Sequence, residues 1–183
     1  FGCDPARFAE SEYKPGSIGS FLELHIEQGP VLDLAHKPIG VVSGISGPLW
    51  LTVKLRGMAG HAGSVPMPIR KDALVGAAEI IIALREIATQ VPGDPTVGTV
   101  GTLNVFPASR NIIPEEVTFT VDLRDIDLDR RNRYEKQLRD RIEAITQKHG
   151  LTYCISEDTN SAPRYCSDWI KEIIHNQCKA LEL

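Results

Sequence analysis

Apolar and polar side chains alternate in several separate stretches of the chain, and this period of two predicts half-buried β-strands. The clearest stretches are residues 49–56 and 117–124, where every second residue is Leu, Val or Phe. Weaker versions of the same pattern lie at residues 21–27, 38–45, 96–105 and 151–155. We expect a strand in each of these places.

Three other stretches place apolar residues three and four positions apart, which is the spacing of an amphipathic helix. These stretches are residues 72–90, 129–149 and 167–181. Gly150 directly follows the second stretch and is predicted to end that helix in a left-handed conformation. The chain therefore alternates between strand and helix patterns over most of its length.

The elements predicted between residues 46 and 158 follow the order β-α-β-β-α-β. This order is typical of a ferredoxin-like α+β unit, with a four-stranded antiparallel sheet and both helices on one face. A Gly- and Pro-rich stretch, residues 44–48, precedes it and is predicted to be a hinge. Residues 1–45 and 159–183 flank the unit, and we expect them to be pieces of an α/β domain.

Composition narrows the class of protein. The chain is 42% hydrophobic and 24% charged, as in ordinary globular proteins, and its net charge is -4. Without a basic patch or a long apolar stretch, we expect neither a nucleic-acid nor a membrane partner. The four cysteines are scattered, which favours reduced thiols in a cytoplasmic protein. The chain starts without Met and ends inside a predicted helix, so we expect a fragment.

His25 lies in the predicted strand at residues 21–27, between Glu23 and Glu27 on the same side. Imidazole and carboxylate are both good ligands for divalent metals such as zinc. His25 is therefore a candidate metal ligand. The alternative is a partly buried histidine hydrogen-bonded to a neighbouring carboxylate, because a zinc site needs three or four ligands.

His61 stands in the string Gly60-His61-Ala62-Gly63, whose small neighbours leave the imidazole unobstructed. A histidine in such a place can donate a hydrogen bond to an oxyanion that develops during a reaction. The alternative is a histidine in a flexible loop without a catalytic role.

Two further polar residues fit an amide-bearing, acidic substrate. Asn111 offers both a donor and an acceptor to an amide or ureido group, although Asn also occurs in turns for conformational reasons. Arg124 lies among the polar positions of the strand at 117–124, so it points away from the helices and could grip a carboxylate with two hydrogen bonds. The alternative for Arg124 is a surface ion pair with Asp122 or Asp125, which would contribute little to stability.

These residues stand in strings that resemble the N-carbamoyl-L-amino-acid hydrolase family, which includes allantoate amidohydrolases and β-ureidopropionases. The strings are His25-Ile26-Glu27-Gln28-Gly29-Pro30, Gly60-His61-Ala62-Gly63, Ser109-Arg110-Asn111 and Asp122-Leu123-Arg124-Asp125. The first string is specific to the carbamoylase branch, whereas the second would suit the whole superfamily of two-domain, two-metal peptidases and deacylases. The resemblance runs from about residue 19 to the C-terminus.

The resemblance implies a role for each candidate residue. His25 would be one terminal ligand of a binuclear metal centre, and Gln28 would contact the substrate. His61 would reach across a homodimer to the substrate of the partner and stabilise the tetrahedral oxyanion. Asn111 and Arg124 would be the pair that holds the substrate, with Arg124 binding its carboxylate.

The resemblance also implies an activity for the intact enzyme. Two divalent ions (zinc, manganese, cobalt or nickel) would support cleavage of the carbamoyl C–N bond of an N-carbamoyl-L-amino acid or allantoate, releasing amino acid, ammonia and carbon dioxide. Residues 46–158 would be its lid and dimerisation domain, 1–45 a fragment of its catalytic domain, and 159–183 the start of the returning catalytic segment.

The other metal ligands of the family and its general-base Glu have no counterpart here. We therefore expect the fragment alone to hold no metal pair and to be inactive. The alternatives are an exopeptidase or deacylase of the same superfamily and a non-catalytic dimerisation or binding module.

Overall fold

A computed structural model describes residues 4–183. The chain divides into two compact units. The first contains residues 1–40, described from residue 4 onward, together with residues 178–183, and the second contains residues 41–177. The first unit contains the 3-10 helix η1 (Pro5–Ser11) and the short helix α1 (Val31–Leu34). Helix α4 (Asp168–Ala180) begins in the second unit and ends in the first. No helix among residues 4–183 is long and apolar enough to cross a membrane.

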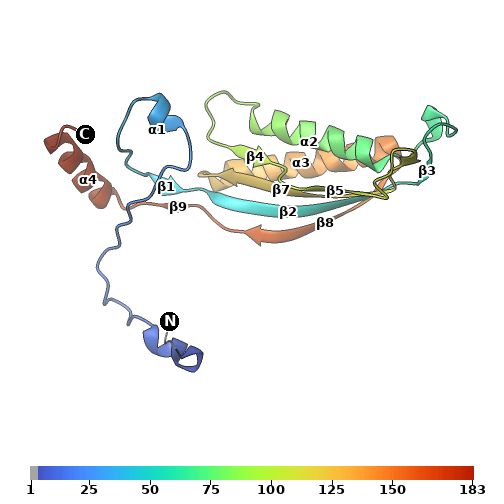
Figure 1. The fold of residues 1–183 in the computed structure, drawn as a ribbon. Coiled ribbons are helices and arrows are strands. Elements are labelled where there is room, and N and C mark those ends of the chain that lie inside the picture. The colour runs from blue at the N-terminus through green and yellow to red at the C-terminus, as the bar shows by residue number, and fades with distance from the viewer. Residues whose placement is uncertain (1–3) are drawn as a thin grey trace. The chain divides into compact units, whose positions relative to one another are not determined.

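The second unit is built on an antiparallel sheet (Figure 1). Its long strands are β2 (Gly47–Arg56), β7 (Glu116–Asp125) and β8 (Thr152–Asn160), and two short strands, β4 (Val97–Thr99) and β5 (Leu103–Phe106), follow one another along β7. The strand order is β4-β7-β2-β8, with β5 also paired to β7. Both β2 and β7 are therefore central strands with a neighbour on each side.

Helices α2 (Ala73–Ala88) and α3 (Leu128–His149) cover one face of this sheet (Figure 1). Asp72 accepts hydrogen bonds from two backbone N–H groups of the first turn of α2, and Asp127 does the same for one N–H group of α3. Such caps typically contribute about 1 kcal/mol each. Gly150 ends α3 with φ of 63°, as predicted.

The core lies between the helices and the sheet. Every second residue of β2 and β7 points into it, which explains why the alternation is so regular in these two strands. The core residues fully removed from solvent include Leu49, Leu51, Val53, Leu55, Val117, Phe119, Leu123, Leu138 and Ile142. Burying each of these side chains contributes roughly 1.5–3 kcal/mol. The opposite face of the sheet carries polar side chains, as the pattern predicted.

The structure corrects the prediction of four strands. Residues 96–105 form β4 and β5 instead of one strand, so the sheet has five strands. Between them the backbone N–H of Thr102 donates to the side-chain hydroxyl of Thr120 (3.2 Å), and this contact interrupts the regular backbone pairing. Gly101 lies in the same interruption.

Two more strand predictions were wrong or too long. Residues 21–27 form no strand, because alternation alone does not supply backbone pairing, and none of the strands among residues 4–183 pairs with them. Of residues 38–45, only β1 (Gly44–Ile45) is a strand, paired with β9 (Arg164–Tyr165). Residues 44–48, for which we predicted a hinge, lie mostly in β1 and the start of β2.

Candidate functional site

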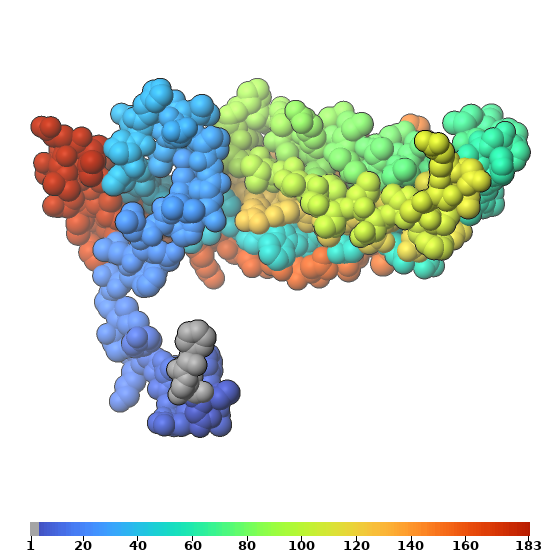
Figure 2. Space-filling model, in the orientation of Figure 1, coloured from blue at the N-terminus to red at the C-terminus, as the bar shows by residue number. Residues whose placement is uncertain are grey.

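His61 and Asn111 lie next to each other at one end of the second unit. The two-residue strand β3 (Gly60–His61) pairs with β6 (Ile112–Ile113), so that His61 is opposite Ile112. The backbone N–H of Ala62 donates to the carbonyl of Asn111 at 2.9 Å. In Figure 2 the segments around residues 60–68 and 107–112 form one continuous surface at this end. Folding thus joins two residues that are 50 positions apart in the sequence.

The ring of His61 is exposed and its orientation is set by its own loop. The backbone N–H of Gly63 donates to Nδ1 of His61 at 3.1 Å. Because Nδ1 accepts this bond, the neutral imidazole carries its proton on Nε2. An Nε2–H group is a donor suited to an oxyanion.

Two side chains that the sequence analysis did not single out hold this end in shape. Arg70 donates to the carbonyl oxygens of Ala62 (2.6 Å) and Val65 (3.0 Å), which fixes the loop after His61. The hydroxyl of Ser109 donates to Oδ1 of Asn111 at 2.9 Å, which leaves the amide NH₂ of Asn111 as its donor group. The position of Ser109 two residues before Asn111 was the only signal in the sequence for this contact.

Arg124 lies on the sheet face that points away from the helices, as predicted from its position in the strand. Its guanidinium binds the carboxylate of Asp122 through Nε (2.8 and 3.1 Å) and Nη2 (2.7 Å). The hydrogen bond to Asp122 raises the pKa of Arg124 against the opposing effect of burial. The ion pair with Asp122, which was the alternative role of Arg124, is therefore present, whereas Asp125 is buried on the other face and binds Arg130 (2.5 Å).

Arg124 and Asn111 lie at opposite ends of the sheet. Arg124 is paired in register with Pro48, at the start of β2, whereas Glu116, at the Asn111 end of β7, is paired with Arg56. Eight residues of strand separate Arg124 from Glu116, which corresponds to about 27 Å. One small molecule cannot touch Arg124 and Asn111 of the same chain.

His25 and Gln28 belong to the first unit and are both exposed. Nδ1 of His25 lies 2.5 Å from the carbonyl oxygen of Ile26, and Gln28 has a positive φ of 57°. The carboxylate of Glu27 accepts hydrogen bonds from the first turn of α1, including one from Val31 N–H at 2.8 Å. Glu27 therefore acts as a helix cap here.

The described residues do not by themselves fit a two-metal centre. Among residues 4–183, no three His, Cys, Asp or Glu side chains gather closely enough to hold an ion. His25 would be a single ligand, and a binuclear site needs several convergent ones.

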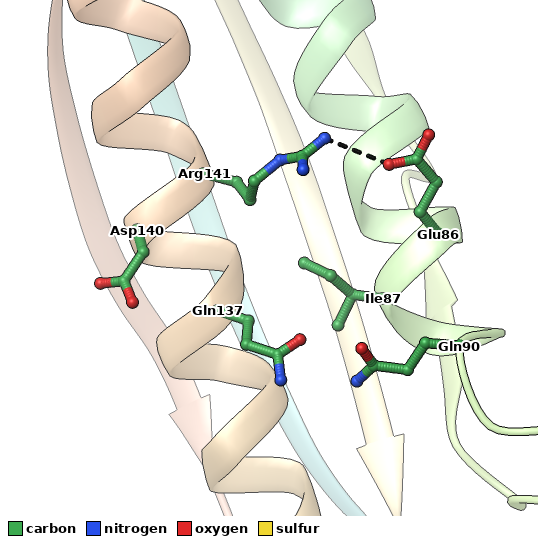
Figure 3. A pocket seen from close by; sticks show the side chains of 6 residues that line it. All are labelled: Glu86, Ile87, Gln90, Gln137, Asp140 and Arg141. Carbon is green, nitrogen blue, oxygen red and sulfur yellow. Dashed lines mark hydrogen bonds and ion pairs between the residues drawn. The ribbon is translucent and has the colours of Figure 1, made fainter.

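A shallow polar groove runs between α2 and α3 on the helical face of the second unit (Figure 3). It is lined by Glu86, Ile87, Gln90, Gln137, Asp140 and Arg141. An ion pair of 3.1 Å between Arg141 and Glu86 crosses it. The groove lies on the opposite side of the sheet from Arg124, so it is not part of the candidate site.

Comparison with known proteins gives consistent matches. Residues 43–150 match the family described as a peptidase dimerisation domain. The chain is 46% identical over 183 residues to an N-carbamoyl-L-amino-acid amidohydrolase of Pseudomonas sp. (strain NS671), covering 100% of this chain and 44% of that protein. It is 38% identical over 174 residues to an allantoate deiminase of Arabidopsis thaliana, covering 86% and 33%.

Solved structures agree with these sequence relatives. An amidase of the hydantoinase/carbamoylase family from Burkholderia multivorans superimposes with a TM-score of 0.84 at 33% identity, covering 86% of this chain and 38% of that one. The chain thus spans less than half the length of the relatives that it matches.

Proposed function

Because the chain belongs to the peptidase dimerisation domain family, we propose that it is the subunit-pairing and substrate-holding part of an amidohydrolase that cleaves N-carbamoyl-L-amino acids or allantoate. In this proposal residues 46–158 are a ferredoxin-like lid, and the flanking segments 1–45 and 159–183 belong to the catalytic domain. The observation that carries the proposal is that His61 lies beside the Asn111 segment at one end of the sheet, whereas Arg124 lies at the other end. The names of the relatives support the choice of reaction.

The substrate roles follow from the donor groups. Arg124 binds the carboxylate of the substrate, and the NH₂ group of Asn111 donates to its carbonyl or ureido oxygen. His61 donates through Nε2 to the oxygen that becomes negative when water adds to the carbamoyl carbon. The resemblance also implies a substrate contact for Gln28. Cleavage consumes one water and yields the amino acid, ammonia and carbon dioxide.

The relatives' reaction, as the resemblance implies, uses two divalent metal ions. His25 is the one residue of this chain that we assign to them, and the remaining ligands would come from outside the chain. The residues that the structure describes do not form the site of these metals by themselves.

We further propose a homodimer formed through the edge of β4 and β5. This edge is unpaired and carries the exposed apolar side chains of Val97, Leu103 and Phe106, and Ile82 of the adjacent α2 is also exposed. In Figure 2 the segment of β4 and β5 runs along the near surface of the unit. The opposite edge, β8, exposes only Tyr153 among its large apolar residues. An exposed apolar edge is a ready template for pairing with a second copy.

A two-fold axis at this edge would explain the separation of the candidate residues. Antiparallel pairing of residues 97–106 with the same residues of a second copy reverses the direction of one unit. The Arg124 end of one copy then lies beside the end of its partner that bears His61 and Asn111. Each substrate would be held by Arg124 of one copy and by His61 and Asn111 of the other.

Arg124→Lys in the full-length protein tests the role of the guanidinium. Lysine keeps the charge but loses the planar, two-pronged geometry, so kcat/KM should fall by roughly 30- to 1,000-fold, or about 2–4 kcal/mol. Arg139→Lys is the matched control, because Arg139 forms a partly buried ion pair with Glu135 on α3 (2.7 Å), on the helical side of the sheet. Near-normal kcat/KM for Arg124→Lys on a substrate with a carboxylate would contradict the proposal. A panel of carbamoyl amino acids, allantoate and dipeptides would separate the carbamoylase from an exopeptidase.

A further inference from the structure

Arg124 is held by two neighbours to which no role has been given so far, Asp122 and Trp50. Asp122 is two positions earlier on the same strand and on the same face, and Trp50 is opposite Asp122 on β2. The three side chains form one cluster on the polar face of the sheet. This cluster lies at the Arg124 end, about the length of β7 away from His61.

Asp122 occupies one particular edge of the guanidinium. Its carboxylate binds Nε and Nη2, with distances of 2.7–3.1 Å. A guanidinium has a second two-pronged edge, formed by its two terminal nitrogens, and this edge is the one that a further carboxylate can bind end-on. Asp122 therefore fixes the plane of Arg124 without consuming its capacity for a substrate carboxylate.

Trp50 supports the same group from the face of its ring. The Cζ atom of Arg124 lies 5.9 Å from the centre of the indole, within the range of a cation–π contact. The side chain of Trp50 is 43% exposed. The next residues of β2 on the same face, Thr52 and Lys54, are polar. The ring is thus a large apolar surface in a polar setting, and it is not part of the core.

We propose that Asp122 and Trp50 are positioning residues for Arg124, and that the exposed ring of Trp50 selects substrates with an apolar α-side chain. This inference rests on the proposed function, because it needs Arg124 to bind the α-carboxylate. The α-carbon is one bond from that carboxylate, so the substrate side chain lies within reach of the ring beside Arg124. An apolar ring desolvates a leucine or phenylalanine side chain and offers nothing to glycine or to a second ureido group.

The test uses two substrates with the full-length protein, N-carbamoyl-L-leucine and N-carbamoylglycine. Asp122→Asn keeps the shape but loses the charge that orients Arg124, so KM should rise about tenfold for both substrates while kcat stays within about twofold. Trp50→Thr should raise KM about tenfold for the leucine substrate and at most about threefold for the glycine substrate. Trp50→Phe keeps an apolar ring, so it should restore most of the preference for the leucine substrate over the glycine substrate.

Controls separate this role from simple stabilisation. Glu135→Gln breaks the partly buried ion pair with Arg139 on α3 and should change neither KM. Melting temperatures identify any variant that is poorly folded, and Trp50→Gln carries the same prediction if Trp50→Thr unfolds. A purely structural role would lower the melting temperature without splitting the two substrates.

Arg124→Ala distinguishes failure of the positioning role alone from failure of the proposed function. If it destroys activity while Asp122→Asn and the Trp50 variants leave both KM values unchanged, the positioning role is wrong and the proposed function stands. If Arg124→Ala itself leaves both substrates unaffected, the proposed function fails, and this inference fails with it.

Discussion

Replacing Arg131 by methionine should weaken the folded second unit far more than replacing an exposed arginine of α3. Its side chain is 1% exposed and lies where β2 begins and β8 ends. The guanidinium donates to the carbonyl oxygens of Gly47 (3.1 Å) and Ser161 (2.5 Å) and to Oδ1 of Asn160 (2.5 Å). One side chain of α3 therefore joins the start of β2 to the end of β8, which lie side by side at one end of the sheet.

The expected magnitude follows from these contacts. Methionine fills a similar volume but leaves the three oxygens without this donor, at about 1–3 kcal/mol for each one that stays buried and unpaired. Removing a buried charge recovers part of that cost. The net loss should be about 2–4 kcal/mol, which corresponds to a urea midpoint lower by about 1–2 M.

Urea unfolding followed by circular dichroism measures this loss. Arg133→Met is the matched control, because Arg133 is an exposed arginine on the same helix. It should shift the free energy of unfolding by less than about 0.5 kcal/mol. If Arg131→Met and Arg133→Met have equal midpoints, the role of Arg131 as a clamp is refuted.

Three further predictions concern stability and metal binding. Gly57→Ala should lower the free energy of unfolding by more than about 2 kcal/mol, because the new Cβ would lie 1.9 Å from the Lys71 carbonyl oxygen. Gly101→Ala is its control and should leave the melting temperature nearly unchanged, because the nearest atom to its Cβ would be 3.8 Å away. Burial alone would raise the pKa of Asp125, but hydrogen bonds, first that of Arg130, lower it. Asp125 should thus stabilise the fold above about pH 4 and lose this effect as the pH falls through its lowered pKa. The urea midpoint of Asp125→Asn should therefore fall less steeply at acid pH than that of the unchanged chain. Equal steepness in the two proteins would count against this. In calorimetry, zinc or manganese should bind the 183-residue chain no better than its His25→Ala variant, and tight binding of two equivalents that depends on His25 would overturn the incomplete-site interpretation.

Some parts of the fold could be predicted because the sequence pattern reflects burial directly. Strands β2 and β7 each bury one full face, so their alternation is complete, and Gly150 marks the end of α3. Residues 21–27 show the same alternation without a partner strand, and there the prediction was wrong. Alternation reports an amphipathic segment, whereas pairing depends on residues far away in the chain.

In the candidate site, too, features that depend on neighbouring residues could be predicted, whereas contacts between distant segments could not. The face of Arg124 and its ion pair with Asp122 could be predicted, because both depend on neighbouring positions of one strand. The family resemblance drawn from short motifs is confirmed by the match of residues 43–150 to the dimerisation-domain family and by 46% identity to an N-carbamoyl-L-amino-acid amidohydrolase. The contact of His61 with the Asn111 segment depends on the pairing of β3 with β6, which no local pattern signals. The resemblance also grouped Asn111 with Arg124, and only the structure shows that one chain keeps them apart.

In the proposed homodimer, one substrate is held by two copies of the chain. A purified heterodimer of full-length His61→Ala and Arg124→Ala subunits, isolated with two affinity tags, tests it. One of its two sites would receive an intact Arg124 and an intact His61, so it should regain about half of the wild-type activity, although both homodimers are nearly inactive. A heterodimer of wild type with the double variant should stay inactive, because each site then lacks one residue. An inactive first heterodimer and a half-active second one would show that both residues serve the same chain, and would contradict the account.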